Sequence, residues 1–278
     1  MIRVGAVDIG TNSTRLLVAD VERGELVDVL RRSAVTRLGE GVDAGRVLLA
    51  EPIRRTLAVL SDYRDDCARL GTSHVLAVAT SAARDAANGR EFLAGVEESL
   101  GFATRLLTGD EEADLTRRGV GAVDHGTLVL DVGGGSTEII LAGFRTSLDI
   151  GSVRLTERFL KSDPPAPDEL GAAGAFVAGL LPELAVSAAI GVAGTVTQLH
   201  EIAGELSVKN VERELRRLGA MTVAERAAVP RMDPARAPVI VGGAIVVREV
   251  LRRYGLQALG WSMRDLLDGV ALEAAGGE

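Results

Sequence analysis

Two acidic residues flank a glycine-rich turn in the middle of the chain. Residues 127–143 read TLVLDVGGGSTEIILAG, in which Asp131 precedes the turn and Glu138 follows it. The apolar runs on both sides predict strand, tight turn and strand. Glycines there allow positive φ and leave no Cβ in the way, so main-chain N–H groups can surround an anion. The phosphate-holding residues predicted in this turn are Gly133, Gly134, Gly135, Ser136 and Thr137.

A plain turn is the alternative, because glycine-rich hairpins are common. The same pattern, however, occurs twice: residues 6–20 include VDIGTNSTRLLVAD, and Asp8 aligns with Asp131. This alignment also superposes Gly10 on Gly133 and Ser13 on Ser136. The phosphate-holding residues predicted in the first copy are Gly10, Thr11, Asn12, Ser13 and Thr14. A repeat at about half the chain length predicts two related domains.

The composition limits the classes of function. The chain has 278 residues and 47% hydrophobic content, enough for two cores. Its net charge of −8 argues against a general partner of nucleic acid or of an anionic membrane. Cys67 is the only cysteine, which excludes an internal disulfide and predicts a core residue. The first residues lack a targeting pattern and no apolar run approaches the length of a membrane span, so we expect a cytoplasmic protein.

Periodicity predicts the element order βββαβαβα for the first half, repeated with insertions in the second. We expect domains at residues 1–120 and 121–278, with the last helix able to pack back on the first domain. Residues 38–46 and the run TSAARDAANGR are predicted as loops, and residues 148–151 as a strand. Trp261 is predicted to lie in the core. The three histidines, His74, His125 and His200, lack the spacing of a zinc site and are interpreted as structural.

Eight segments together carry a family resemblance. They are DIGTNSTRLLVAD, RLGEGVDAGR, ATSAARDA, TGDEEADL, LDVGGGSTE, GSVRLTERF, GVAGTVT and DLLDGVALE. In this order they resemble the exopolyphosphatase and guanosine pentaphosphate phosphatase (Ppx/GppA) family over essentially the full chain. The resemblance implies two RNase-H-like α/β domains of the actin, sugar kinase and heat-shock ATPase superfamily, with the active site in the cleft between them. The chain resembles the short type that lacks further C-terminal helical domains.

The resemblance implies a catalytic role for Glu112, which directly precedes alanine in the segment GDEEA. From the residues alone, the acids at positions 110–112 equally fit favourable charge at a helix N-terminus. Thr108 and Glu111 have the spacing of a capping box, so Glu111 is expected to cap the helix.

Phosphate-binding positions in other segments also follow from the resemblance. It implies that Arg84 and Arg154 bind substrate phosphate, although a solvated loop charge is the plain alternative for Arg84. Gly194 and Thr195 resemble the phosphate or nucleotide turn of the second domain, and a helix N-terminus after Gly194 would itself attract an anion.

The acids Asp8, Asp131 and Glu138 are the candidate metal ligands. Carboxylates together with water and phosphate oxygens suit Mg²⁺, with Mn²⁺ as the other candidate. Alternatively, Asp131 or Glu138 orients the attacking water or holds its hairpin through backbone hydrogen bonds.

The leading hypothesis is a metal-dependent exopolyphosphatase that releases terminal orthophosphate from inorganic polyphosphate, with short chains preferred, and that forms a homodimer as relatives do. The first alternative is hydrolysis of guanosine pentaphosphate, which is a guanosine alarmone. A non-hydrolytic sensor of polyphosphate or alarmone and a sugar-kinase-like transferase are the others. The sequence has no GxxxxGK[ST], GxGxxG or GxSxG motif, which argues against a P-loop enzyme, a dinucleotide enzyme and covalent serine catalysis.

Overall fold

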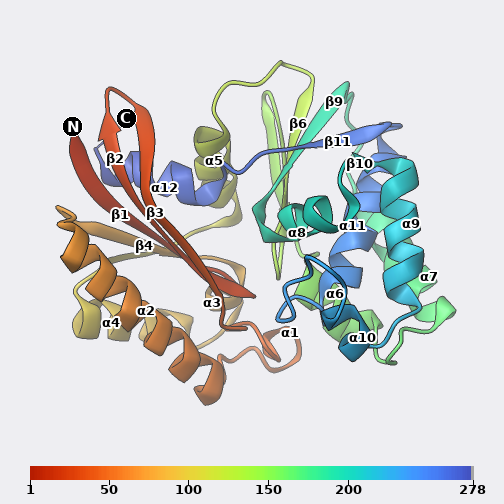
Figure 1. Cartoon of the computed structure of the whole chain (residues 1–278), viewed down its shortest axis with the longest axis horizontal. Helices are drawn as coiled ribbons and strands as arrows, with labels where there is room; N and C mark the ends of the chain where they lie inside the picture. Colours follow the sequence, from red (N-terminus) through yellow and green to blue (C-terminus); the bar gives the residue numbers. More distant parts are fainter. Residues whose placement is uncertain (277–278) are drawn as a thin grey trace. The chain divides into compact units, whose positions relative to one another are not determined.

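The computed structural model describes residues 1–276, which form two compact units (Figure 1). Unit 1 comprises Met1–Gly121 and the chain from Arg264 onward, and unit 2 comprises Ala122–Met263. The last helix therefore belongs to unit 1. Both units contain a mixed β-sheet with flanking helices.

The sheet of unit 1 has the order β3-β2-β1-β4-β5. Strands β1 and β2 are antiparallel, and β1, β4 and β5 are parallel to one another. The elements of this unit are β1 (Ile2–Ile9), β2 (Ser13–Glu22), β3 (Glu25–Val35), α1 (Val42–Gly45), α2 (Ala50–Leu70), β4 (Val75–Ala79), α3 (Ser81–Asp85), α4 (Gly89–Leu100), β5 (Ala103–Leu106), α5 (Gly109–Val120) and α12 (Leu266–Ala274).

The sheet of unit 2 has the order β8-β7-β6-β9-β11-β10, which repeats that of unit 1 with β10 added at the edge. The predicted fold class, two α/β domains of RNase-H-like topology, is confirmed. The elements of this unit are β6 (Thr127–Val132), β7 (Thr137–Leu141), β8 (Phe144–Leu148), α6 (Ser152–Phe159), α7 (Pro167–Leu180), β9 (Ala188–Val192), α8 (Ala193–Ala203), β10 (Leu206–Ser207), α9 (Val208–Gly219), α10 (Val223–Ala227), α11 (Ile240–Arg253) and β11 (Ala258–Trp261).

The two first hairpins close in the same way. Gly10 N donates to Ser13 O at 3.0 Å, and Gly133 N donates to Ser136 O at 3.1 Å. Of the two reasons that we expected for these glycines, the positive φ is wrong, because neither Gly10 nor Gly133 has one. A Cβ would instead lie 2.9 Å from Ser13 O at Gly10 and 3.0 Å from Ser136 O at Gly133. Glycine is therefore needed for a close backbone approach.

Side chains alternate between the two faces of the sheet in unit 1, as the period of a strand requires. Val7 and Ile9 of β1 belong to the core under α2 and α4, whereas Val4 and Ala6 belong to the core with α5 and α12. Asp8 shares the parity of Ala6, so its side chain lies on the α5 and α12 face. Arg15 shares the parity of Leu17 in β2 and lies on that face as well.

Helices α5 and α12 pack with their backbones in contact. A Cβ at Gly119 of α5 would overlap Asp265 O, and a Cβ at Gly269 of α12 would overlap Leu115 O. The two glycines thus allow the last turns of α5 to approach the first turn of α12 closely. Because protein interiors are densely packed, neither site has room for a methyl group.

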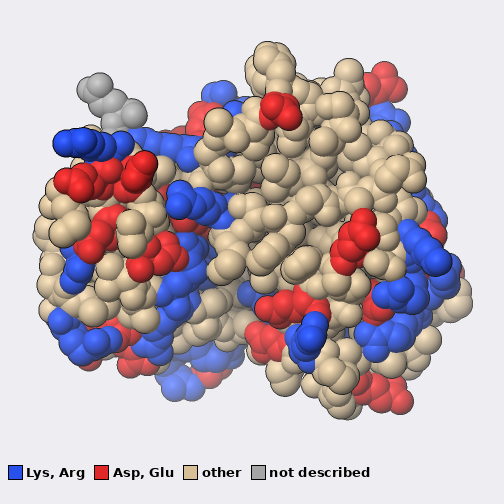
Figure 2. Space-filling model, turned by 45° about the horizontal axis from the view of Figure 1, so that its top comes forward, with Lys and Arg blue, Asp and Glu red and all other residues tan. Residues whose placement is uncertain are grey.

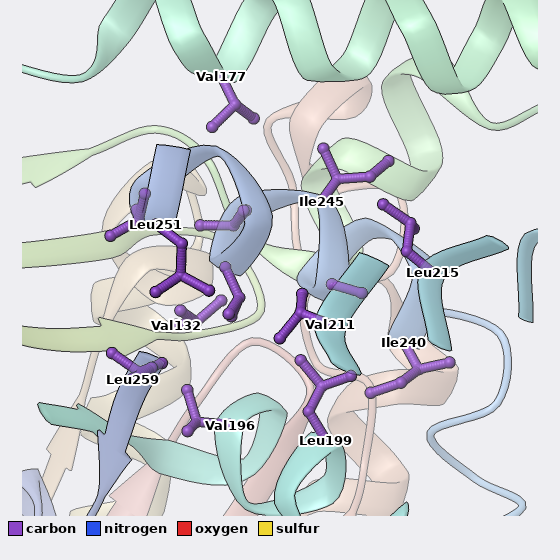
Figure 3. Close-up of a cluster of buried hydrophobic side chains, with 14 of the residues drawn as sticks. Val132, Val177, Val196, Leu199, Val211, Leu215, Ile240, Ile245, Leu251 and Leu259 are labelled. Carbon is purple, nitrogen blue, oxygen red and sulfur yellow. The ribbon is translucent and has the colours of Figure 1, made fainter. Parts of the chain in front are cut away.

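The core of unit 2 lies between its sheet and the helices that cover it. Figure 3 shows Val132 of β6 and Leu259 of β11 among side chains of α8, α9 and α11, including Val196, Val211 and Ile245. Helix α11 packs against α6 and α8. The first turn of α6 is bonded to the glycine-rich turn, and α8 directly follows β9.

Four local expectations were wrong and one was confirmed. The expected loop at 38–46 contains α1, and Leu38 and Val42 are buried in the α2 core. The second expected loop contains α3, and the strand expected at 148–151 ends at Leu148. Trp261 is 37% exposed and not a core residue, because its ring stacks on His200 and its indole N–H reaches the hydroxyl of Thr197. Cys67 is buried, as expected.

Charged side chains of both signs are intermixed on the face drawn in Figure 2. The exposed ion pairs of the protein include Arg54 with Glu51 and Arg64 with Asp65. Such pairs contribute little to stability. Within residues 1–276, no helix combines the length and apolar character needed to cross a membrane.

Candidate active-site residues in each unit

The ends of three neighbouring strands bring the candidate residues of unit 1 together. Strands β1, β4 and β5 are parallel, so their carboxyl ends meet at one edge of the sheet, where ligands commonly bind. The turn of residues 10–12 follows β1, Thr80 and α3 follow β4, and Thr108 and α5 follow β5. The hydroxyls of Thr11 and Ser81 lie 3.3 Å apart and link the first two segments.

The buried Glu112 and the partly buried Arg84 form an ion pair at this edge. Arg84 Nη1 donates to Glu112 Oε2 at 3.0 Å and to Leu107 O at 2.9 Å. Burial raises the pKa of Glu112 to about 7, against the opposing effect of Arg84, and the charge of Asp8 adds to the rise. Glu112 is therefore a carboxylate that can exchange a proton near neutral pH. The structure shows Arg84 engaged with Glu112, a contact that the sequence did not predict.

The neighbouring acid has the structural role that its spacing predicted. Thr108 N donates to Glu111 Oε2 at 2.8 Å, and Glu111 N donates to Thr108 Oγ1 at 3.2 Å, which completes a capping box. The bonds that the backbone N–H and the hydroxyl of Thr108 donate to the Glu111 carboxylate hold its pKa below its usual value. The predicted capping role of Glu111 is confirmed. Of these two adjacent acids, one caps the helix and the other is buried at the strand ends.

Asp8 is held on one side only. Arg15 lies opposite it in the β1–β2 register, and its Nε and Nη2 donate to Asp8 Oδ2 at 2.9 and 2.8 Å. Asp8 Oδ1 is buried and has no hydrogen-bond partner among residues 1–276, and the same is true of Asn12 Oδ1. Burial raises the pKa of Asp8, and Arg15 opposes this rise. Two buried acceptor oxygens in one turn suit a cation or a donor from a ligand.

In unit 2 the equivalent hairpin carries two acids side by side. Asp131 and Glu138 are directly opposite each other in the antiparallel register, so both side chains point to the same face. Asp131 is 5% exposed and Glu138 is fully buried. Ser147 of β8, opposite Glu138 on its other side, donates its hydroxyl to Glu138 Oε1 at 2.8 Å. Two adjacent buried carboxylates favour a nearby positive charge.

The glycine-rich turn of unit 2 rests on the N-terminus of α6. Gly133 O accepts from Ser152 N at 3.0 Å, and Gly134 O accepts from Val153 N at 2.8 Å. Arg154 is buried, and its Nε donates to Gly135 O at 2.7 Å. The first turn of α6 and the side chain of Arg154 therefore fix the backbone of the turn through its carbonyl oxygens. Thr137 adds a bond of 2.5 Å from its hydroxyl to Ile150 O.

The Gly194–Thr195 turn begins α8 directly after β9. Ala193 has a φ of 64°, an unusual conformation for a residue with a Cβ. The guanidinium of Arg236 lies against Gly194, where a Cβ would overlap it. Gln198 holds the loop that carries this arginine, because its Nε2 donates to Arg231 O at 2.8 Å. Sequence reasoning missed Arg236.

No group of three or more His, Cys, Asp or Glu within residues 1–276 has the arrangement to hold a metal ion by itself. A divalent cation here would take one or two carboxylates and complete its shell with water and phosphate oxygens, as Mg²⁺ usually does. Asp8, with its buried unpartnered oxygen, and the adjacent pair Asp131 and Glu138 fit that requirement.

Comparison with known proteins agrees with this arrangement of strands and turns. A model of the Ppx/GppA phosphatase family matches residues 17–277. The chain belongs to this family. The resemblance predicted from the sequence is thereby confirmed.

Relatives in the Ppx/GppA family match over nearly the whole chain. "Exopolyphosphatase 2" of Mycobacterium tuberculosis strain H37Rv is 41% identical over 99% of both chains. The crystal structure of an exopolyphosphatase from Cytophaga hutchinsonii superposes with a TM-score of 0.90 at 25% identity, covering 99% of each chain. The Ppx/GppA family member of Aquifex aeolicus has a TM-score of 0.78 at 27% identity, covering 99% of this chain and 97% of its own.

Proposed function

We propose that the protein is an exopolyphosphatase, a hydrolase that releases terminal orthophosphate from inorganic polyphosphate by attack of water. The observation that carries this proposal is the similarity to Exopolyphosphatase 2 of M. tuberculosis, at 41% identity over 99% of both chains. Hydrolysis of a phosphoanhydride needs neutralised phosphate charge and an oriented water. The buried carboxylate of Glu112 supports the proposal because it supplies a candidate base.

Glu112 is assigned as the residue that orients the attacking water and accepts its proton. Its pKa of about 7 lies near neutral pH, and a general base is most effective when its pKa is close to the pH of the reaction. Arg84 Nη1 donates to Oε2 and also to Leu107 O, so the guanidinium is fixed by the backbone and in turn fixes the carboxylate. We therefore assign Arg84 first to positioning Glu112, in addition to the phosphate contact that the family resemblance implies.

Substrate phosphates are assigned to the two hairpin turns and to the start of α8. Backbone N–H groups in glycine-rich turns and helix N-termini favour anions. The firm anchoring of the second turn on α6 and Arg154 supports a preorganised site. The residues proposed to hold phosphate are Gly10, Thr11, Asn12, Ser13, Thr14, Arg84, Gly133, Gly134, Gly135, Ser136, Thr137, Arg154, Gly194 and Thr195.

A divalent cation, Mg²⁺ or Mn²⁺, is the proposed cofactor, with Asp8, Asp131 and Glu138 as its protein ligands. When bound, such a cation would neutralise charge on the phosphate oxygens. The fit rests on Asp8 Oδ1, a buried oxygen without a partner in the described chain, and on the chemistry of the adjacent Asp131 and Glu138 carboxylates.

The test is phosphate release from a series of polyphosphates and from guanosine pentaphosphate, with Mg²⁺, with Mn²⁺ and with EDTA. We expect orthophosphate from polyphosphate with metal and none with EDTA. Folded protein that releases no phosphate from any polyphosphate would overturn the proposal. A higher kcat/KM on guanosine pentaphosphate would change the assigned substrate, and tight binding without turnover would indicate a sensor.

A further inference from the structure

Arg15 lies between two buried carboxylates that are far apart in the sequence. Its Nε and Nη2 donate to Asp8 Oδ2, and its Nη1 donates to Asp265 Oδ2. The exposed fractions of the three side chains are 15% for Arg15, 7% for Asp8 and 5% for Asp265. We call this arrangement the Asp8–Arg15–Asp265 triad. Because a guanidinium is planar and presents its donors in a fixed fork, it fixes the direction of both carboxylates.

The triad leaves one oxygen of Asp8 available. Both bonds from Arg15 end on Oδ2, while Oδ1 is buried and has no partner among residues 1–276. A Cβ at Gly10 would lie 3.8 Å from Oδ1 and 3.9 Å from Oδ2, so the turn backbone passes close to the Asp8 carboxylate. By donating twice to Oδ2, Arg15 fixes the plane and direction of the Asp8 carboxylate. Arg15 therefore sets the direction in which the second oxygen is presented to a ligand.

Asp265 in turn holds Arg15 in place. It is the N-cap of α12, where its Oδ1 accepts from Leu267 N at 2.9 Å while its Oδ2 binds Arg15. The next acid of the same cap, Asp268, is bound by Arg31 Nη2 at 2.7 Å. Asp265 thus has one oxygen committed to the helix and the other to the arginine. It directly follows Arg264, the residue at which the chain re-enters unit 1.

We infer that Asp265 and Arg15 are positioning residues that orient Asp8 so that Oδ1 is presented to the divalent cation of the reaction. The inference rests on the proposed function for its reaction, but its structural claim concerns cation binding and can be tested without substrate. Partners in the outer shell of a metal site typically change metal affinity or activity by about 10–100-fold when they are replaced.

The main test is Asp265→Asn, which retains a good N-cap but removes the charge. A neutral amide oxygen cannot serve both Leu267 N and Arg15, so Arg15 is expected to lose its second anchor. Titration of Mn²⁺ into the metal-free protein, followed by calorimetry, should show weaker binding by about 10-fold or more. In the phosphate-release assay, kcat at fixed metal should fall by a similar factor while KM for polyphosphate stays within about twofold.

Arg15→Lys separates orientation from charge. Lysine keeps the positive charge but is a single point donor that cannot hold two carboxylates in a fixed geometry. We expect the same loss of Mn²⁺ affinity as for Asp265→Asn. The matched control is Glu273→Gln, which removes the ion pair of α12 with Arg105 without contact to Arg15 or Asp8. The control should keep the Mn²⁺ affinity of the wild type.

The outcomes are distinguishable. The inference is overturned if Asp265→Asn, folded by circular dichroism, keeps its Mn²⁺ affinity within about twofold, or if Glu273→Gln loses as much. It is also overturned if the wild type binds no Mn²⁺. Weakened Mn²⁺ binding in both triad variants supports the inference even where the wild type hydrolyses no polyphosphate, a result that would overturn only the proposed function.

Discussion

The two hairpins of this protein have the same backbone but opposite charge at one position. Asp8 faces Arg15 in unit 1, whereas Asp131 faces Glu138 at the same place in the register of unit 2. The first acid is thus oriented by an arginine of its own hairpin. The second lies beside another buried carboxylate, where added positive charge is favoured. The two copies of the hairpin therefore differ in charge at one position, Arg15 in the first and Glu138 in the second, and this difference changes the surroundings of the equivalent acid from positive to negative.

The helices that follow the last strand of each sheet show a similar divergence. Both α5 and α12 begin with a capping box, Thr108 with Glu111 in one and Asp265 with Asp268 in the other. The next residue is the buried Glu112 in α5 and Gly269 in α12. A Cβ at Gly269 would overlap Leu115 O, so packing excludes any side chain there. The close helix contact therefore leaves room for an acid directly after the capping box in α5 but not in α12.

The largest expected effect comes from removing that single acid. Glu112→Gln keeps the shape and an acceptor for Arg84 but removes the base, so kcat should fall by about 10³-fold, within the range for general-base catalysis. Phosphate release from polyphosphate measures it, and substrate binding should persist. The adjacent Glu111→Gln is the control and should keep wild-type turnover, because glutamine at this position can still accept from Thr108 N in the capping box. Equal turnover in Glu112→Gln and wild type would move the base to another residue.

Next in size is the effect of a methyl group between the paired helices. Gly269→Ala would force the backbones of α5 and α12 apart, and we expect a loss of about 3 kcal/mol in unfolding free energy. Urea denaturation measures it. Gly95→Ala in α4 is the matched control, because a Cβ there meets nothing within 4 Å. Helix propensity predicts that this control gains up to about 1 kcal/mol. Equal stability of the two variants would contradict the close contact.

A smaller effect is expected from making the second hairpin less acidic. Glu138→Gln keeps an acceptor for Ser147 but removes one of the two adjacent charges, so Mn²⁺ binding should weaken by about 10-fold. Calorimetry on the metal-free protein measures this. Glu183→Gln, in the same unit and 93% exposed, is the control for lost net charge. Unchanged affinity in Glu138→Gln would show that the paired acids of unit 2 do not bind the cation.

The sequence predicted the parts of the fold that depend on local pattern. Aligning Asp8 with Asp131 implied equivalent sheets, and the spacing of Thr108 and Glu111 implied the capping box. It could not show that Asp265 reaches Arg15, because those residues are 250 positions apart and meet only when α12 packs on the sheet. One signal was present in the sequence: when Asp8 is aligned with Asp131, Arg15 is aligned with Glu138. A change of charge sign between the two repeats indicates that the residue has a different partner in each.

Other differences have the same origin. The contact of Arg84 with Glu112 arises because β4 and β5 are adjacent, which places residues 28 positions apart at one edge of the sheet. Trp261 was expected in the core from its apolar character, but its polar N–H and its stacking partner His200 hold it at the surface. In both cases the position of the side chain depends on contacts between residues far apart in the sequence, which local sequence patterns do not show.

The smallest expected effect is a shift in the pH profile through Arg84. With the pKa of Glu112 at about 7, kcat/KM should rise with pH up to about 7 and then level, since the base must be ionised. Arg84 lowers this pKa through its charge and hydrogen bond, so Arg84→Gln should move the rising limb to higher pH. The control is Arg105→Gln, whose guanidinium contacts Glu111 and Glu273 instead.

The pH dependence of the unfolding free energy is an independent measure of the pKa of Glu112. The pKa of Glu112 is raised on folding from its ordinary value of 4.5, so the stability that this group contributes is fully present below about pH 4.5 and is lost as pH rises through about 7. The unfolding free energy of the wild type should therefore fall relative to Glu112→Gln across that window, by at most about 3 kcal/mol. A constant difference between the two proteins from pH 4.5 to 7 would show that Glu112 titrates normally, and the base would then owe nothing to its burial beside Arg84.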